Sequence, residues 1–288
     1  MTLTIFSFLY LSIVCLVFFN IRESLRIGTL AVASVLYVLS LNQRAAVFVL
    51  VVSVLTWGCG LLTGFLLKKE RRVAAGFSAA LPIIAAIAAL ALFKYGPDLK
   101  SEGIMDFPFK VVMPIGFSFY IFQVISYLTD IYKGTVEADR SWLKVFIYLC
   151  WFPKFVSGPI ERKDAFDTQI QKVNKVSFLH TVPWGKVFSY ILTGCFYKIV
   201  IADRLGIYVK KLFEEYGDYG SLWLIIGAFM YSFQIYCDFA GYSYAAIGIS
   251  EIFGIELTEN FMMPYYSANI TEFWRRWHRS LSSWLKDY

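Results

Sequence analysis

Long apolar runs dominate this sequence and restrict the folds it can adopt. About 20 apolar residues of α-helix cross a bilayer core. Because lipid cannot hydrogen-bond backbone polar groups, such runs predict an all-α, polytopic membrane protein. We expect roughly nine membrane-embedded segments, at about 3–20, 27–41, 45–67, 73–93, 113–132, 142–156, 184–202, 221–237 and 239–255.

Several of these segments are too short or too interrupted to span cleanly. The run 142–156 contains Pro153, and the run 239–255 contains Gly241, Gly248 and Gly254. We therefore expect re-entrant helices there, surrounded by protein or by a water-filled cavity. The more polar stretches 157–183 and 256–273 suit the membrane interface. The whole chain, 1–288, is expected to form a single, incomplete membrane domain.

Composition and charge agree with this fold class. Hydrophobic residues make up 58% of the chain and charged residues 17%, against roughly 25% charged in soluble domains, which argues against a soluble enzyme. The net charge of +6 comes from short basic clusters between apolar runs. That pattern is typical of loops that flank membrane helices, and it does not indicate nucleic-acid binding. The five Cys residues form no CxxC pair, so neither a disulfide framework nor a zinc or other metal site is implied.

Ionisable residues near the membrane segments are functional candidates, because their burial is costly unless they are solvated or paired. Asp203 beside Arg204 is interpreted as an ion pair at a helix end, and Asp130 with Lys133 as an i, i+3 pair. Asp238 has no such simple role, since apolar residues precede it and a Gly-rich bend follows.

The stretch 271–288 carries the most informative pattern. Read as one helix, it places Trp274 and His278 one turn apart, and its apolar stripe consists of Trp274, Trp277, Leu281 and Trp284. Arginines and aromatic rings around His278 predict a depressed pKa and a neutral imidazole, which a general base needs. The alternative is an interfacial anchor whose histidine is only hydrogen-bonded. His180, the other histidine, is expected in a simple loop.

Five segments in order resemble the membrane-bound O-acyltransferase (MBOAT) family: 113-MPIGFSFYIFQVISYLTDIYKG-134, 152-FPKFVSGPIER-162, 198-KIVIADRL-205, 234-QIYCDFAGYSYAAIGISEIFG-254 and 258-TENFMMPYYSANITEFWRRWHRSLSSWLKDY-288. The resemblance implies helices around a tunnel, an acyl donor on the cytoplasmic side, and an acyl group that leaves toward an extracytoplasmic acceptor. His278 matches the first of two family histidines. The second lies a few dozen residues downstream in the family, so the chain is expected to be truncated at its C-terminus.

Within the family, these sequence segments are most similar to the bacterial branch that O-acetylates polysaccharides such as alginate. D-alanyl transfer to teichoic acid is the related alternative. The resemblance implies acetyl-CoA as donor, no bound cofactor, an SGNH-type partner outside the membrane and a bacterial cytoplasmic membrane location. Two other classes stay open, a non-catalytic scaffold and a transporter. Besides His278, the candidates for the tunnel or for substrate binding are Asp238, Glu272, Trp274, Arg275, Arg276 and Trp277. The arginines suit either donor phosphates or lipid headgroups.

Overall fold

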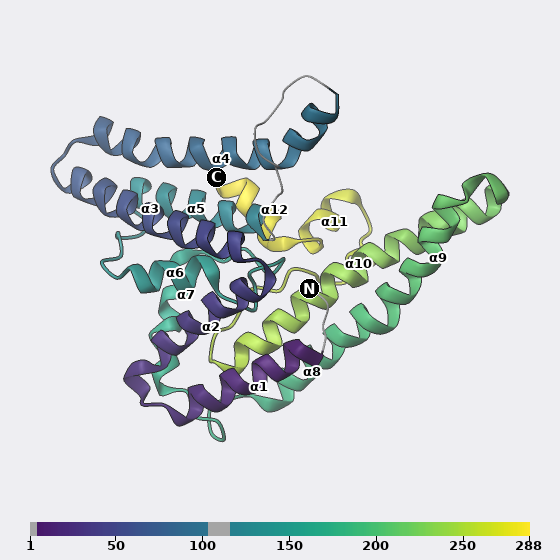
Figure 1. The fold of residues 1–288 in the computed structure, drawn as a ribbon, viewed down its shortest axis with the longest axis horizontal. Helices are drawn as coiled ribbons and strands as arrows, with labels where there is room; N and C mark the ends of the chain where they lie inside the picture. Colours follow the sequence, from purple (N-terminus) through teal and green to yellow (C-terminus); the bar gives the residue numbers. More distant parts are fainter. Residues whose placement is uncertain (1–4, 103–115) are drawn as a thin grey trace. The chain divides into compact units, whose positions relative to one another are not determined.

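The computed structural model describes residues 5–102 and 116–288, and within these ranges it contains helices and no β-strand (Figure 1). The all-α prediction is confirmed. Five helical stretches in the described residues are long and apolar enough to cross a membrane, as expected of a multi-pass membrane protein: Glu23–Leu41, Ala46–Lys68, Arg72–Leu99, Trp184–Glu214 and Ser221–Ile252.

The chain divides into two compact units. The first, here called the α2–α7 unit, comprises residues 21–156, 160–174 and 287–288. Its helices are α2 (Arg26–Leu41), α3 (Gln43–Lys68), α4 (Arg72–Ser101), α5 (Phe117–Lys133), α6 (Trp142–Cys150) and α7 (Lys163–Ile170), with short 3₁₀ turns η1 (Glu23–Leu25) and η2 (Val173–Lys175).

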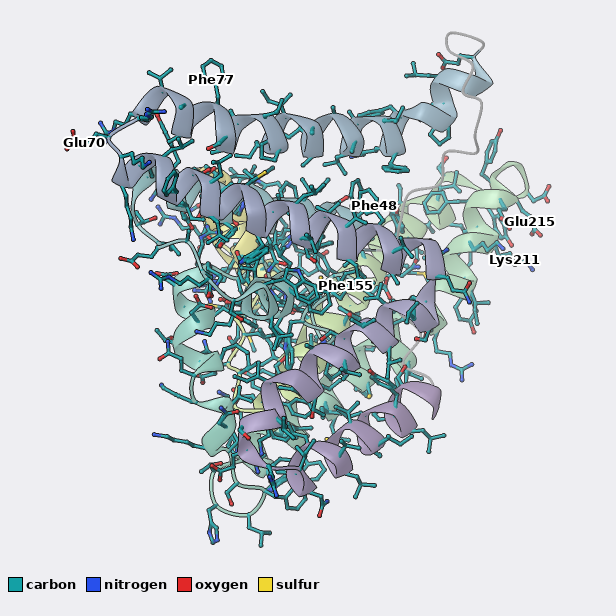
Figure 2. All side chains as sticks on the ribbon, turned by 60° about the vertical axis from the view of Figure 1, so that its left-hand side comes forward. Phe48, Glu70, Phe77, Phe155, Lys211 and Glu215 are labelled. Carbon is teal, nitrogen blue, oxygen red and sulfur yellow. The ribbon has the colours of Figure 1, made fainter. Side chains whose placement is uncertain are left out.

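Helices α3 and α4 form a hairpin whose turn contains Glu70 (Figure 2). Phe77 on α4 points away from the hairpin and is 73% exposed, as expected of a lipid-facing side chain. On the inner side, the ring of Phe48 packs edge-on against Phe117 of α5 at 5.1 Å. The predicted segment 113–132 begins at residues 113–115, which lie outside the described residues, and α5 follows at Phe117.

Helix α6 has nine residues, fewer than a membrane crossing needs. Residues 151–156 continue as turns, and Trp151 is fully buried. Part of the predicted interfacial connection also lies inside the unit, because Lys163 is 0% exposed. Its ammonium is paired with Asp139 at 3.2 Å and with Asp167, which offsets the cost of burying the charge.

The predicted pair of Asp130 with Lys133 is wrong. The carboxylate of Asp130 accepts hydrogen bonds from the hydroxyl of Tyr288 at 2.8 and 2.7 Å. Lys133 instead donates to the backbone carbonyl of Asp287 at 3.0 Å. An i, i+3 spacing permits a pair, but here residues distant in sequence supply the partners.

The second unit, here called the α8–α12 unit, comprises residues up to Asn20, 157–159 and 175–286. Its helices are α1 (Ile5–Asn20), α8 (Trp184–Cys195), the π-helix η3 (Phe196–Ala202), α9 (Asp203–Glu214), α10 (Ser221–Ile252), α11 (Ile270–Arg276) and α12 (Arg279–Asp287), with 3₁₀ turns η4 (Tyr216–Asp218) and η5 (Pro264–Tyr266). The segments α8, η3 and α9 form one continuous rod beside α10 (Figure 1), and Lys211 and Glu215 lie near the tip of this hairpin (Figure 2).

The expected interruption between 221–237 and 239–255 is wrong, because α10 is one helix of 32 residues. Its glycines provide close packing instead of a bend. A Cβ added to Gly241 would lie 2.8 Å from the carbonyl oxygen of Gly194 and 2.9 Å from the backbone nitrogen of Lys198. Small residues let membrane helices approach closely in this way.

This contact predicts that Gly241→Ala destabilises the α8–α12 unit. The added methyl group meets backbone atoms that cannot rotate away, and overpacking of this kind costs about 1–3 kcal/mol. We expect a lower midpoint of thermal unfolding in detergent for Gly241→Ala than for the wild type. Gly185→Ala on α8 is the matched control, because its Cβ would meet no atom within 4 Å. Equal unfolding midpoints for the two variants would contradict the packing argument.

Candidate active site

His278 lies at a break between two short helices, α11 and α12. The single helix predicted over 271–288 is therefore wrong at residues 277–278. Trp277 is extended, with ψ 127°, and His278 has φ 43°, in the left-handed region that residues other than Gly seldom adopt. Trp274 and His278 consequently do not lie one turn apart on one helix, and Trp274 is 54% exposed.

The chain segment 260–262, which follows α10, supplies hydrogen bonds on both sides of this break. The backbone N–H of Met262 donates to the carbonyl of Arg276 at 3.0 Å, and the N–H of Arg279 donates to the carbonyl of Asn260 at 3.0 Å. Buried backbone groups need such partners. The segment thus takes the place of the intrahelical bonds that the break removes.

Aromatic rings surround the imidazole of His278, which is 7% exposed. The Phe239 ring from α10 meets it edge-on at 4.6 Å, and the Phe261 ring lies nearly parallel to it at 6.4 Å. Burial lowers the pKa of His278 to about 4, so the imidazole is neutral at pH 7. The direction agrees with the sequence prediction, and the cause is removal from water instead of nearby arginines.

Trp277 belongs to the same aromatic cluster. Its indole stacks on Phe273 at 5.5 Å and meets Phe261 edge-on at 5.1 Å. Tyr236 of α10 completes this side, 6.1 Å from the indole. Of the two tryptophans proposed for the site, the structure therefore places Trp277 against Phe261, which also contacts His278, and Trp274 at the surface.

The charged candidates on α11 are engaged with each other. Glu272 accepts a hydrogen bond from Arg276 at 2.5 Å and from the backbone N–H of Ala268 at 2.9 Å. The Ala268 N–H and the Arg276 guanidinium lower the pKa of Glu272. Asn269 caps the helix by accepting the N–H of Glu272 at 2.8 Å. These contacts stabilise the start of α11, and Arg275 is exposed.

Asp238 is bonded to Lys198 of η3, which also pairs with Asp203 at 2.8 Å. The predicted pair of Asp203 with Arg204 is therefore wrong. Lys198 and Asp203 are five residues apart, a spacing that places them on one face of a π-helix but not of an α-helix. The half-exposed carboxylates of Asp203 and Asp238 share this cation, while Phe239, the next residue, contacts His278.

The described residues contain no group of three or more His, Cys, Asp or Glu side chains that could hold a metal ion. All five cysteines are free thiols. His180 lies exposed in a turn, in agreement with the predicted loop role.

Residues 137–288 match the family described as membrane-bound O-acyltransferase, MBOAT. The chain belongs to the membrane-bound O-acyltransferase family. The matched range contains both the π-helical segment and the break at His278. The family resemblance expected from the sequence is confirmed.

Curated relatives narrow the comparison within this family. The chain is 39% identical to "Probable alginate O-acetylase AlgI" of Pseudomonas fluorescens over 66% of this chain and 38% of the relative. It is 40% identical to the protein of the same name in Pseudomonas putida, over 70% of this chain and 42% of the relative. The "Teichoic acid D-alanyltransferase" of Bacillus subtilis is 30% identical over 81% of this chain and 58% of the relative. The chain thus spans about two fifths of the length of the first two relatives.

Sequence reasoning missed several residues that shape this site. Lys198 was recognisable as a cation inside an apolar run, five residues before Asp203. Asn260 is a polar residue directly before the apolar tripeptide 261–263 and is 0% exposed in the structure. Phe239 and Phe261 gave no signal in a chain so rich in aromatic residues, because only the fold brings them to His278.

The buried imidazole predicts a pH-dependent stability. Since the pKa of His278 falls from 6.5 to about 4 on folding, the unfolded chain binds more protons between these values. Stability therefore rises with pH across this window, by about 3 kcal/mol at most. We expect the unfolding midpoint of the wild type in detergent to fall more between pH 7 and pH 5 than that of His278→Gln. Parallel pH dependences would contradict the burial of a neutral imidazole.

Proposed function

We propose that this chain carries the acyl-transfer chemistry of a membrane-bound O-acyltransferase, with His278 as general base. The observation that supports this most directly is the buried imidazole, held at a helix break with a pKa of about 4. A base must be unprotonated to accept a proton, and His278 meets that condition at neutral pH. The family match over residues 137–288 supports the reaction class.

In the proposed reaction, the imidazole of His278 accepts the proton of a hydroxyl group on the acceptor. The hydroxyl oxygen attacks the thioester carbonyl of the donor, and a tetrahedral oxyanion forms. When the carbon–sulfur bond breaks, His278 returns the proton to the thiolate, so the base is regenerated. The aromatic rings of Phe239 and Phe261 exclude water from one side of the imidazole, which limits hydrolysis of the donor.

We propose acetyl-CoA as the donor and an extracytoplasmic polysaccharide such as alginate as the final acceptor. The names of the Pseudomonas relatives support this assignment. Exposed Arg275 offers a guanidinium for the donor's phosphates, with lipid headgroups as the competing ligand. An SGNH-type protein outside the membrane would receive the acetyl group, and the bacterial cytoplasmic membrane is the proposed location.

D-alanyl transfer to teichoic acid is the second candidate. It is favoured by the Bacillus subtilis relative, which aligns with 81% of this chain. The two candidates differ in the group that is ester-linked to the cell-surface polymer. Mild alkaline hydrolysis of the isolated polymer releases acetate in the first case and D-alanine in the second.

We predict that His278→Ala in the intact gene of the native host lowers polymer acylation at least about a hundredfold, the contribution typical of a general base. The protein should remain in the membrane at wild-type abundance, which immunoblotting of membrane fractions measures. His180→Ala is the matched control, because His180 lies exposed in a turn, and it should leave acylation unchanged. Wild-type acylation by His278→Ala would remove His278 from the mechanism.

A further inference from the structure

Asn260 is fully buried, although it is polar and lies outside any helix. Its backbone carbonyl accepts the N–H of Arg279 at 3.0 Å, and its side-chain Oδ1 accepts the N–H of Ser280 at 3.4 Å. These two N–H groups are the first of α12, directly after His278. The first N–H groups of a helix have no intrahelical partner, so Asn260 acts on α12 as a capping residue does.

This arrangement differs from ordinary capping, because Asn260 lies 18 positions before His278 and on another segment. Ordinary caps are supplied by the residue just before the helix, as Asn269 does for α11. At α12 that place is taken by His278 itself, in a left-handed conformation with φ 43°. Such a conformation is costly for a residue with a side chain and persists only where the surroundings enforce it.

The contacts around His278 show what enforces it. Asn260 fixes the backbone after the histidine, and Met262 fixes the backbone before it by donating to the carbonyl of Arg276. Phe261, between these two residues, lays its ring nearly parallel to the imidazole at 6.4 Å. The backbone hydrogen bonds and the aromatic ring that hold His278 therefore come from one tripeptide, 260–262. Within this tripeptide, Asn260 is the residue whose side chain also accepts a hydrogen bond from α12.

We propose that Asn260 is a positioning residue for His278, which caps α12 from a distant segment and thereby holds the imidazole in its buried, left-handed position. This inference rests on the proposed function, since it assigns a role in setting the proposed general base. Its structural part, the shielding of the imidazole, can be measured without any acyl transfer.

Capping uses only the side-chain oxygen of Asn260, so the amide nitrogen has no part in the cap. This nitrogen, Nδ2, is buried and finds no hydrogen-bond acceptor in the part of the chain that the structure describes. A buried donor without an acceptor is costly, and Asp keeps an acceptor oxygen at the same reach. Because burial favours the neutral form of a carboxyl group, the introduced side chain stays protonated and adds no charge beside the imidazole. Asp is also as good a cap as Asn. Asn260→Asp is therefore the conservative variant, and Asn260→Ala removes the acceptor.

The first measurement is the reaction of diethyl pyrocarbonate with the histidines, quantified peptide by peptide by mass spectrometry on the purified protein in detergent. Exposed His180 is the internal reference. In the wild type, His278 should react far more slowly than His180 at about pH 7, because the imidazole of His278 is buried. We expect Asn260→Ala to speed the reaction of His278 about tenfold, and Asn260→Asp to keep it slow, because a shielded group reacts only after local opening.

The second measurement is acyl transfer from acetyl-CoA in membrane vesicles across a pH series. We expect Asn260→Ala to lower kcat about tenfold or more, because small misplacements of a catalytic group are costly, with KM for acetyl-CoA within about twofold. The acid limb of the profile should move to higher pH, since a better-solvated His278 regains a pKa nearer 6.5. Asn260→Asp should restore most of the rate.

Asn269→Ala is the matched control for loss of a cap. It removes a 2.8 Å capping bond of the same kind from α11, at an exposed position that does not adjoin His278. We expect it to leave the reactivity of His278, the rate and the pH profile unchanged. If it moves them as far as Asn260→Ala does, general loss of helix capping explains the effect and the proposal is wrong.

The remaining outcomes distinguish the positioning role of Asn260 from the general-base role of His278. A slow, wild-type reaction of His278 with the reagent in Asn260→Ala overturns the positioning role, whatever the enzyme does. Faster reaction of His278 in Asn260→Ala together with full acyl transfer by His278→Ala leaves the positioning role intact and overturns the general-base assignment. If Asn260→Ala fails to reach the membrane, Asn260→Asp is used for the test. A His278 that reacts as fast as His180 in Asn260→Asp contradicts the proposal.

Discussion

Every break in a helix leaves buried backbone N–H and C=O groups that some other part of the protein must satisfy. Most of this chain avoids the problem by staying helical, as in α10, which continues through its glycines. At Trp277–His278 the chain does break, and the groups on both sides are bonded by residues 260–262. The buried imidazole exists in its present form because that segment is available.

Buried and half-buried charges in the two units also depend on partners from elsewhere in the chain. In the α2–α7 unit, Lys163 is fully buried and is held by two carboxylates. In the α8–α12 unit, Lys198 likewise holds two carboxylates, and those are half exposed. In both cases one ammonium group is shared by two carboxylates. Desolvation makes such clusters costly without close pairing. One carboxylate lies on the same helical rod as the lysine, Asp167 for Lys163 and Asp203 for Lys198, and the other lies on a different segment.

Much of the fold was predictable because long apolar runs permit little besides helices. The positions of α2, α3 and α5, the short α6 and the family resemblance followed from the sequence. The single helix expected over 271–288 did not hold, because the spacing of Trp274, Trp277 and Trp284 fits a helix and gives no sign of a break enforced from residue 260. The partners of Asp130 and Asp203 were also wrong. Local spacing suggested Lys133 and Arg204, whereas a distant Tyr288 and a π-helical Lys198 are the actual partners.

The π-helical segment η3 also determines which changes this region tolerates. Its wider turn brings Lys198 and Asp203 to one face and joins two α-helical stretches that both pack on α10. Deleting one residue between them would turn this stretch into α-helix, and the ion pair would survive with i, i+4 spacing. Because α9 runs on directly from Asp203, its buried Val209 and Leu212 would then keep their present faces. The π-helical turn therefore accommodates one extra residue without turning α9 away from α10.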